Sequence, residues 1–387
     1  MKYGIFLWGA AGVLLTGLVG ACDKFEELPR GGKETAFIVL EEVAQLLSTV
    51  PLGAEQMAEV RDGSTASALN GYDEEYRMCD LFASPGSGVG ASASTKAPAY
   101  SRPLRELLRE AAQARYATKA GAGDASAWLD SLAASDVQIY WPGADAWDGV
   151  QLPVITYDPG DGALRNEGYE LLPSGGVRKL LVDEQMASDR PVWVVNRNSD
   201  AEYKSLELLR REDPSWGNGG GDILVSKADK DIQTLVLRSF KAHRQFDTWF
   251  AGGAEFVVRL GAVENFKAAT EEDLRRYTPS ITDFMIVVRR KQLEEELPFN
   301  AVLVSEWTSQ LASAAFCITE DDGGTQTSWK CSATVKYNSK AYGFEMQIPL
   351  NTRDDIVWRG QLSRHYVERY SGSVAHFGDV DVVLELE

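Results

Sequence analysis

Acidic pairs stand at turns in the last part of the chain, and they are the first side chains whose spacing could do chemistry. Asp321-Asp322 and Asp354-Asp355 lie at the ends of predicted strands, and Asp379 lies in a third turn. Calcium takes about six to eight oxygen ligands, which loops at one end of a β-sandwich can supply. No EF-hand spacing is present, and paired acids at turns are commonly solvated. Calcium binding at these five residues is therefore one hypothesis, and solvated turns are the alternative.

Cysteines are the second group of reactive side chains. Cys317 and Cys331 flank a predicted hairpin turn at residues 320–324, so they could lie opposite each other across two strands. In an oxidising compartment such a pair can form a disulfide, whereas two buried free thiols would act as small apolar side chains. Both interpretations stay open, and Cys79 has no evident partner.

The familiar catalytic motifs are absent from this sequence. Its three histidines are His243, His365 and His376, and no two of them have the spacing of an HExxH zinc site. There is also no CxxC pair, no GxSxG turn around a nucleophilic serine and no phosphate-binding GxxxxGK[ST] loop. A triad assembled from distant residues remains an alternative, but we favour a structural role for each histidine. No catalytic residue is therefore predicted.

Aromatic residues cluster beside two glycine-containing turns. Tyr140, Trp141 and Trp147 surround a Pro-Gly turn, and Trp249-Phe250 precede another glycine pair. Exposed aromatic rings on β-rich surface proteins can stack on sugars, although such residues more often belong to the core. Glycan binding is one hypothesis for them, and core packing is the alternative.

The first 22 residues have the pattern of an export signal. Lys2 precedes an apolar run at residues 5–19, which is shorter than the roughly 20 residues that span a bilayer as a helix. The run ends in Val19-Gly20-Ala21-Cys22, which resembles a lipobox. We expect residues 1–21 to be a cleaved signal peptide and Cys22 to carry diacylglycerol and palmitate. An uncleaved N-terminal anchor is the alternative.

The residues after Cys22 bear on the membrane to which the lipid would attach. The acidic stretch at 23–27 resembles surface-export signals in lipoproteins of the Bacteroidota, whereas an aspartate directly after the cysteine indicates inner-membrane retention in enterobacteria. We favour the outer membrane of the cell envelope, with surface exposure as a further expectation.

Composition narrows the class of protein. A net charge of −18 over 387 residues repels nucleic acid and anionic headgroups, so we expect no nucleic-acid partner. A hydrophobic content of 44% with ten tryptophans indicates a packed core. After the first apolar run, no other stretch is apolar enough for a second membrane span.

The pattern of apolar residues predicts helices first and strands later. Apolar stripes with helical spacing occur at 34–49, 103–118, 124–134 and 201–211, and residues 84–99 read as a flexible linker. Strands are predicted at 137–141, 152–157 and 191–195, and the last has the unbroken apolar character of a strand buried on both faces. From residue 231 onward, strand signals follow one another with turns between them, as in an antiparallel sandwich.

The expected fold class is therefore α+β, predominantly β, with a helical N-terminal part followed by an antiparallel β-rich body. We expect a signal peptide at 1–21, a helical region at 22–134, a mixed β-rich region at 135–230 and a C-terminal β-sandwich at 231–387.

Four segments resemble a group of uncharacterised Bacteroidota lipoproteins. They are 138–142 (QIYWP), 191–198 (PVWVVNRN), 320–325 (EDDGGT) and 354–360 (DDIVWRG). The resemblance would cover most of the chain after Cys22 and implies a lipid-anchored exported protein with a C2-like C-terminal sandwich. It implies no activity and no site residues.

Together these patterns favour a lipid-anchored binding or structural protein of the cell envelope, with a glycan or a protein at the cell surface as its partner. The alternative is an extracytoplasmic hydrolase that acts on glycan or peptide. No cofactor is evident beyond the calcium hypothesis.

Overall fold

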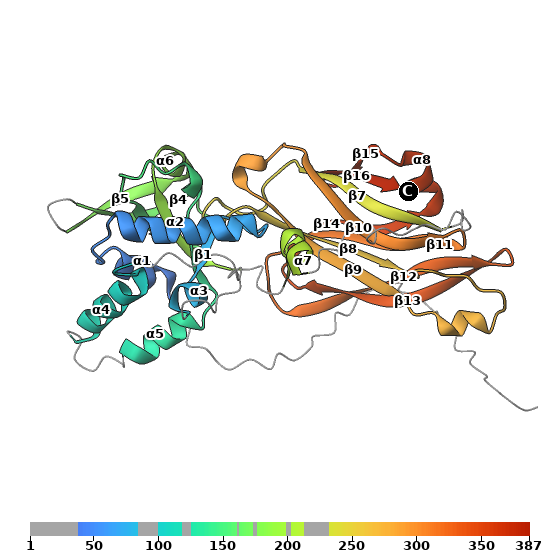
Figure 1. Cartoon of the computed structure of the whole chain (residues 1–387), viewed down its shortest axis with the longest axis horizontal. Coiled ribbons are helices and arrows are strands. Elements are labelled where there is room, and N and C mark those ends of the chain that lie inside the picture. Colours follow the sequence, from blue (N-terminus) through green and yellow to red (C-terminus); the bar gives the residue numbers. More distant parts are fainter. Residues whose placement is uncertain are drawn as a thin grey trace, which may run out of the picture.

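The structure is a computed structural model that describes residues 38–83, 100–117, 125–160, 162–172, 176–198, 203–212 and 232–387. The predicted signal peptide, Cys22, the acidic stretch after it and the linker at 84–99 lie outside these residues. The described chain forms an N-terminal and a C-terminal domain that lie end to end along the long axis (Figure 1).

The N-terminal domain is built on one six-stranded sheet. In spatial order the strands are β1 (Glu75–Arg77), β2 (Val137–Tyr140), β6 (Val192–Arg197), β3 (Val154–Tyr157), β4 (Arg165–Leu171) and β5 (Val177–Asp183). Neighbouring strands are antiparallel except for β3 and β6, which run parallel.

Helices cover one face of this sheet. They are α1 (Leu40–Leu47), α2 (Ala54–Leu69), α3 (Met78–Phe82), α4 (Leu104–Ala117) and α5 (Ala125–Ala133). Their apolar side chains share one core with Ile139, Ile155, Trp193 and Val195 of the sheet. The helices before residue 134 and the strands after it therefore belong to the same domain. None of the described helices is long and apolar enough to cross a membrane.

The opposite face of the sheet is covered partly by the C-terminal domain. Val154, Val192 and Val194 pack there against Trp249 and Phe250, together with α6 (Glu184–Asp189). The five residues of β6 from 192 to 196 are all buried. The prediction that this strand is buried on both faces is therefore confirmed.

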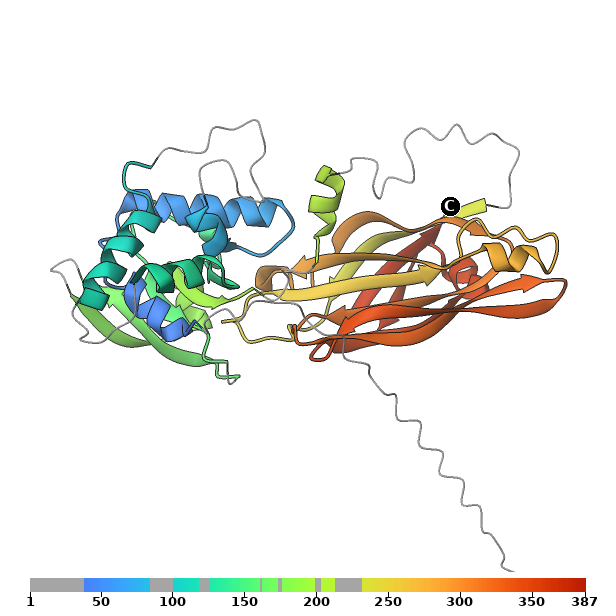
Figure 2. The same cartoon turned by 90° about the horizontal axis from the view of Figure 1, so that it is seen from below.

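The C-terminal domain contains two antiparallel sheets. Its strands are β7 (Ile232–Ala242), β8 (Ala254–Ala262), β9 (Ser280–Val288), β10 (Leu297–Thr308), β11 (Leu311–Glu320), β12 (Gln326–Tyr337), β13 (Lys340–Asn351), β14 (Asp355–Ser363), β15 (Ser373–Phe377) and β16 (Val380–Leu386). One sheet has the order β10-β7-β16-β15, and the other has the order β13-β12-β11-β8-β9 with β14 also paired to β11. The strands run along the long axis of the molecule (Figure 2).

The two sheets pack face to face on one apolar core. Leu237 and Phe240 of β7 and Val382 of β16 meet Phe256 of β8 and Phe316 of β11 in it. The remaining described elements are two helices and three short 3-10 helices. The helices are α7 (Leu206–Glu212) and α8 (Arg364–Tyr370), and the 3-10 helices are η1 (Ala144–Ala146) of the N-terminal domain, η2 (Asp273–Arg276) and η3 (Arg290–Gln292). The expected α+β class with a C-terminal antiparallel sandwich is confirmed.

Of the two interpretations left open for Cys317 and Cys331, the structure contradicts the disulfide across two strands and has two free thiols. Cys317 lies opposite Arg259 of β8 on one side and Arg359 of β14 on the other. Cys331 lies in β12 opposite Met346 of β13. β11 pairs with β12 only near its start, so β14 occupies the place beside Cys317. Both thiols are free.

Candidate functional site

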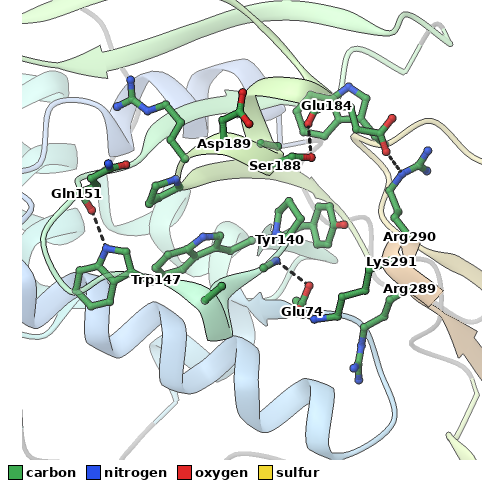
Figure 3. A pocket seen from close by; sticks show the side chains of 18 of the residues that line it. Glu74, Tyr140, Trp147, Gln151, Glu184, Ser188, Asp189, Arg289, Arg290 and Lys291 are labelled. Carbon is green, nitrogen blue, oxygen red and sulfur yellow. Dashed lines mark hydrogen bonds and ion pairs between the residues drawn. The ribbon is translucent and has the colours of Figure 1, made fainter. Parts of the chain in front are cut away.

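A cavity of about 460 Å³ lies at the junction of the two domains (Figure 3). The N-terminal domain contributes the end of β2, the turn into η1 and the helix α6. The C-terminal domain contributes Trp249 and the segment 289–291. Small-molecule sites commonly have volumes of about 300–1,000 Å³ and lie between domains, so the volume and position of this cavity are those of a small-molecule site.

The turn after β2 places two tryptophans at the cavity. Pro142 lacks an N–H and ends the strand, and Gly143 adopts a left-handed backbone conformation with φ of 72°. The Glu74 carboxylate accepts a hydrogen bond of 2.9 Å from the Gly143 N–H, and the Glu74 carbonyl accepts one of 2.8 Å from the Trp141 N–H. These bonds fix the direction in which the chain leaves the sheet towards Trp147.

Aromatic rings form one wall of the cavity. Trp141 and Trp147 meet edge to face with ring centroids 6.0 Å apart, and Trp141 also contacts Trp193 at 5.9 Å. Trp147 donates a hydrogen bond of 2.8 Å from its indole nitrogen to the carbonyl of Gln151. Trp141 and Trp249 are only 1% exposed, whereas Trp147 is half-buried. Trp147 is therefore the tryptophan that a ligand can contact most fully.

Charged side chains of both signs form the rim. Arg290 of the C-terminal domain pairs with Glu184 of α6 at 2.6 Å, and Lys291 pairs with Glu74 at 3.1 Å. Arg289 donates a hydrogen bond of 2.7 Å to the carbonyl of Ala68 in α2. These contacts join the two domains around the cavity, so the distance between its walls depends on them (Figure 3).

Tyr140 contributes a phenol to the same cavity. The residue is 2% exposed, and Figure 3 shows its hydroxyl pointing towards the side formed by Arg290 and Lys291. Burial, and after it the neighbouring carboxylates, raises the pKa of Tyr140 well above its ordinary value. The hydroxyl therefore stays protonated and can donate a hydrogen bond to a ligand.

The aromatic residues predicted from the sequence come together here, but the acidic turns do not. Tyr140, Trp141, Trp147 and Trp249 all line the cavity, whereas Phe250 lies in the core behind it. None of the five predicted acidic ligands lines it. The lining also contains no histidine or cysteine among the described residues, so it gives no support to a histidine- or cysteine-dependent hydrolase.

Two of the predicted calcium ligands form a carboxyl pair of their own. Asp321 is fully buried and accepts hydrogen bonds of 3.1 Å from the Gly323 N–H and 3.0 Å from the Asn351 amide. Asp354 accepts one of 2.9 Å from the Asn351 N–H. Burial raises the pKa of Asp354 to about 7, and its contact with Asp321 adds to the shift. Asp354 therefore holds its proton to a higher pH than an ordinary aspartate does.

Asp379 makes its ion pair with a cation and not with the other predicted ligands. It stands in the turn between β15 and β16 and pairs with Arg244 at 3.1 Å. Among the described residues, its carboxylate is not part of the acidic group whose oxygens lie within 4.8 Å of one another, so the structure gives no support to Asp379 as a shared ligand with Asp321, Asp322 and the 354–355 pair.

Another carboxylate group was missed by the sequence reasoning. Oxygen atoms of Asp247, Glu255 and Glu320 all lie within 4.8 Å of one another. Asp247 is also close enough to Asp322 for a hydrogen bond between carboxyl groups. Burial raises the pKa of Asp322 to about 6, and the adjacent negative charges of Asp247 and Asp355 add to the shift. Of the predicted ligands, Asp322 is thus the one that joins this group.

A histidine pair forms the remaining group with metal-like spacing. His243 places Nδ1 3.1 Å from Glu294 and Nε2 3.0 Å from Asp381, and His376 places Nδ1 2.7 Å from Asp381. Both ring nitrogens of His243 thus face carboxylates. A metal ligand needs a free lone pair, so this contact is better explained as an ion-pair network.

Comparisons of this chain with protein-family models, with curated proteins and with solved structures find no match.

Proposed function

We propose that this chain is a lipid-anchored binding protein of the bacterial cell envelope and that its interdomain cavity takes a saccharide. The single observation that carries the saccharide proposal is the cavity wall of Trp141, Trp147 and Trp249 beside a rim of charged side chains. A pyranose ring offers C–H groups on its face and hydroxyls around its edge. Aromatic rings suit the face, and paired carboxylates and cations suit the hydroxyls.

The balance of charge in the cavity agrees with a ligand that is not strongly charged. Its cationic side chains are largely paired with carboxylates, as Arg290 is with Glu184 and Lys291 is with Glu74. A strongly anionic ligand would have to displace these pairs. Hydroxyl groups can instead share such partners without separating them, since each hydroxyl both donates and accepts.

Binding can be tested with the full-length chain in detergent micelles on a glycan array, followed by calorimetric titration of each hit. Trp147→Ala should weaken binding by about 30-fold or more, which corresponds to the roughly 2 kcal/mol of an aromatic anchor in a pocket. Trp128→Ala is the matched control, because Trp128 is also half-buried in the N-terminal domain but packs on Tyr116 away from the cavity. An array without hits, or equal losses in both variants, would contradict the proposal.

The anchor rests on the sequence pattern that ends at Cys22 and can be tested separately. Metabolic labelling with a palmitate analogue should mark the wild-type chain, and Cys22→Ala should abolish the label and release the protein from the membrane fraction. We further propose attachment to the outer membrane with the domains facing outward. Protease treatment of intact cells should then degrade them, and full resistance would contradict the surface location.

A further inference from the structure

We propose that Asp247, Glu255, Glu320 and Asp322 form a calcium-binding site at the end of the sandwich that faces the domain junction. This proposal does not rest on the saccharide proposal, since none of the four residues lines the cavity. It also differs from the sequence hypothesis, which contained only Asp322 of this set.

The fold brings these residues together from three places in the chain. Asp247 lies in the loop between β7 and β8, Glu255 is the second residue of β8, and Glu320 is the last residue of β11. The Asp321 N–H donates a hydrogen bond of 2.9 Å to the carbonyl of Glu255, which fixes the end of β11 beside the start of β8. Asp322 follows directly in the loop after β11. Strand pairing thus brings Glu255 and Glu320 together, and the two loops add Asp247 and Asp322.

Glu320 supplies the observation that points to a ligand. Its side chain is fully buried, and neither carboxylate oxygen accepts a hydrogen bond from any residue that the structure describes. The carboxyl of Asp247 lies within hydrogen-bond reach of Glu320, but it is itself an acidic member of the same cluster. Burying a carboxylate without a donor is costly, and proteins avoid it by pairing the charge or by coordinating a metal. A cation between Glu320 and Asp247 would satisfy both groups.

The surrounding charges leave room for such a cation. Asp158 of the N-terminal domain and Asp355, which lies opposite Glu320 in the strand register, add negative potential. Arg290 is a guanidinium near Asp247, but it already pairs with Glu184. Arg353 is a second guanidinium, near Asp322. The six carboxyl groups of Asp158, Asp247, Glu255, Glu320, Asp322 and Asp355 outnumber these two guanidinium groups, so negative charge is in excess at the site.

Calcium fits this donor set better than zinc or magnesium does. All the donors are carboxylate oxygens, whereas zinc sites are usually built with nitrogen or sulfur ligands. Four carboxyl groups can provide the about six to eight oxygens that calcium takes in irregular geometry. Magnesium requires a nearly ideal octahedron and keeps several waters, for which a fully buried Glu320 leaves little access.

The test is thermal unfolding of the full-length chain in detergent micelles, after chelation and then with increasing calcium or magnesium. The melting temperature of the wild type should rise with the logarithm of free calcium once the site begins to fill, because the ion binds only the folded state. Glu320→Gln keeps the shape and removes the charge, so it should lose this rise, and its metal-free form should melt at or above metal-free wild type. Asp379→Asn is the control and should respond as the wild type does.

Two results would overturn the site. One is a wild-type melting temperature that does not change between chelator and millimolar calcium. The other is a Glu320→Gln variant with an undiminished response, which would place the ion elsewhere. If Glu320→Gln does not fold, Asp322→Asn serves instead, because Asp322 is only partly buried, and it should weaken calcium binding measured by calorimetry at least tenfold. Glycan binding is measured separately, so either proposal can fail alone.

Discussion

Gly253 lies where the β7–β8 loop meets the N-terminal domain, and Gly253→Ala tests the packing of that junction. A Cβ atom at this position would stand 2.7 Å from the carbonyl oxygen of Val288 and 2.9 Å from the Cα of Arg289. Both neighbours are backbone atoms, so no side-chain rotation relieves the clash. The Gly253 N–H also donates a hydrogen bond of 2.7 Å to buried Asp73, which any shift of the loop would stretch.

The clash of the new Cβ and the stretched hydrogen bond to Asp73 together set the expected loss in the free energy of unfolding. Overpacking in a close-packed interior costs about 1–3 kcal/mol, and a weakened hydrogen bond to a buried carboxylate adds about 1 kcal/mol. We therefore expect Gly253→Ala to lower the free energy of unfolding by about 2–4 kcal/mol. Because Arg289 begins the segment that lines the cavity, affinity for a saccharide ligand should fall as well.

Urea unfolding followed by tryptophan fluorescence measures the loss. Gly343→Ala is the matched control, because the nearest neighbour of its new Cβ is the Cβ of Ser332 at 3.9 Å. This control should change the free energy of unfolding by no more than about 0.5 kcal/mol. A Gly253→Ala variant within about 0.5 kcal/mol of the wild type would refute the reasoning.

Three further outcomes follow from buried groups. Trp249→Ala removes a fully buried ring between the domains and should cost about 3–5 kcal/mol in urea unfolding, and a loss below about 1 kcal/mol would speak against that packing. In chelator, the melting temperature should fall as the pH rises from about 5 to about 8. The pKa values of Asp322, at about 6, and Asp354, at about 7, are raised in the folded state, so stability that is complete below about pH 4 is lost as the pH passes through them. A melting temperature that rises between about pH 5 and about pH 8 would contradict the raised pKa values of Asp322 and Asp354. Burial raises the pKa of both Cys317 and Cys331 to about 11, so iodoacetamide should modify them only after unfolding, and a disulfide-linked peptide in the mass spectrum would contradict the free thiols.

Much of the fold could be predicted because burial leaves a periodic pattern in the sequence. The helices α1, α4 and α5 and the buried strand β6 all carry such a pattern. The longest helix of the N-terminal domain, α2, was missed because its inward face is partly polar. Glu59 of α2 accepts a hydrogen bond of 2.6 Å from the Leu104 N–H, and Gln56 donates one of 2.6 Å to the carbonyl of Arg102. Such long-range polar contacts leave no periodic apolar signal.

The candidate site could be predicted only in part, for a similar reason. The aromatic residues around the Pro-Gly turn were identified from the sequence, since clustered aromatics next to a turn are unusual enough to notice. The charged residues of the rim were not, because charged residues are common and the pairs Glu184–Arg290 and Glu74–Lys291 form only when the domains dock. Glu320 was missed because it ends a strand, where nothing in the sequence distinguishes an inward carboxylate from a solvated one.

The docking of the β7–β8 loop has a consequence for how the chain reaches its native state. Val154, Val192 and Val194 of the N-terminal sheet are covered by Trp249 and Phe250, which are synthesised only after the whole N-terminal domain. A chain that emerges N-terminus first therefore carries an uncovered apolar sheet face until those residues appear. Such a face favours association between nascent chains and recruits chaperones. A fragment that stops before residue 249 should accordingly aggregate, although every strand of its sheet is present.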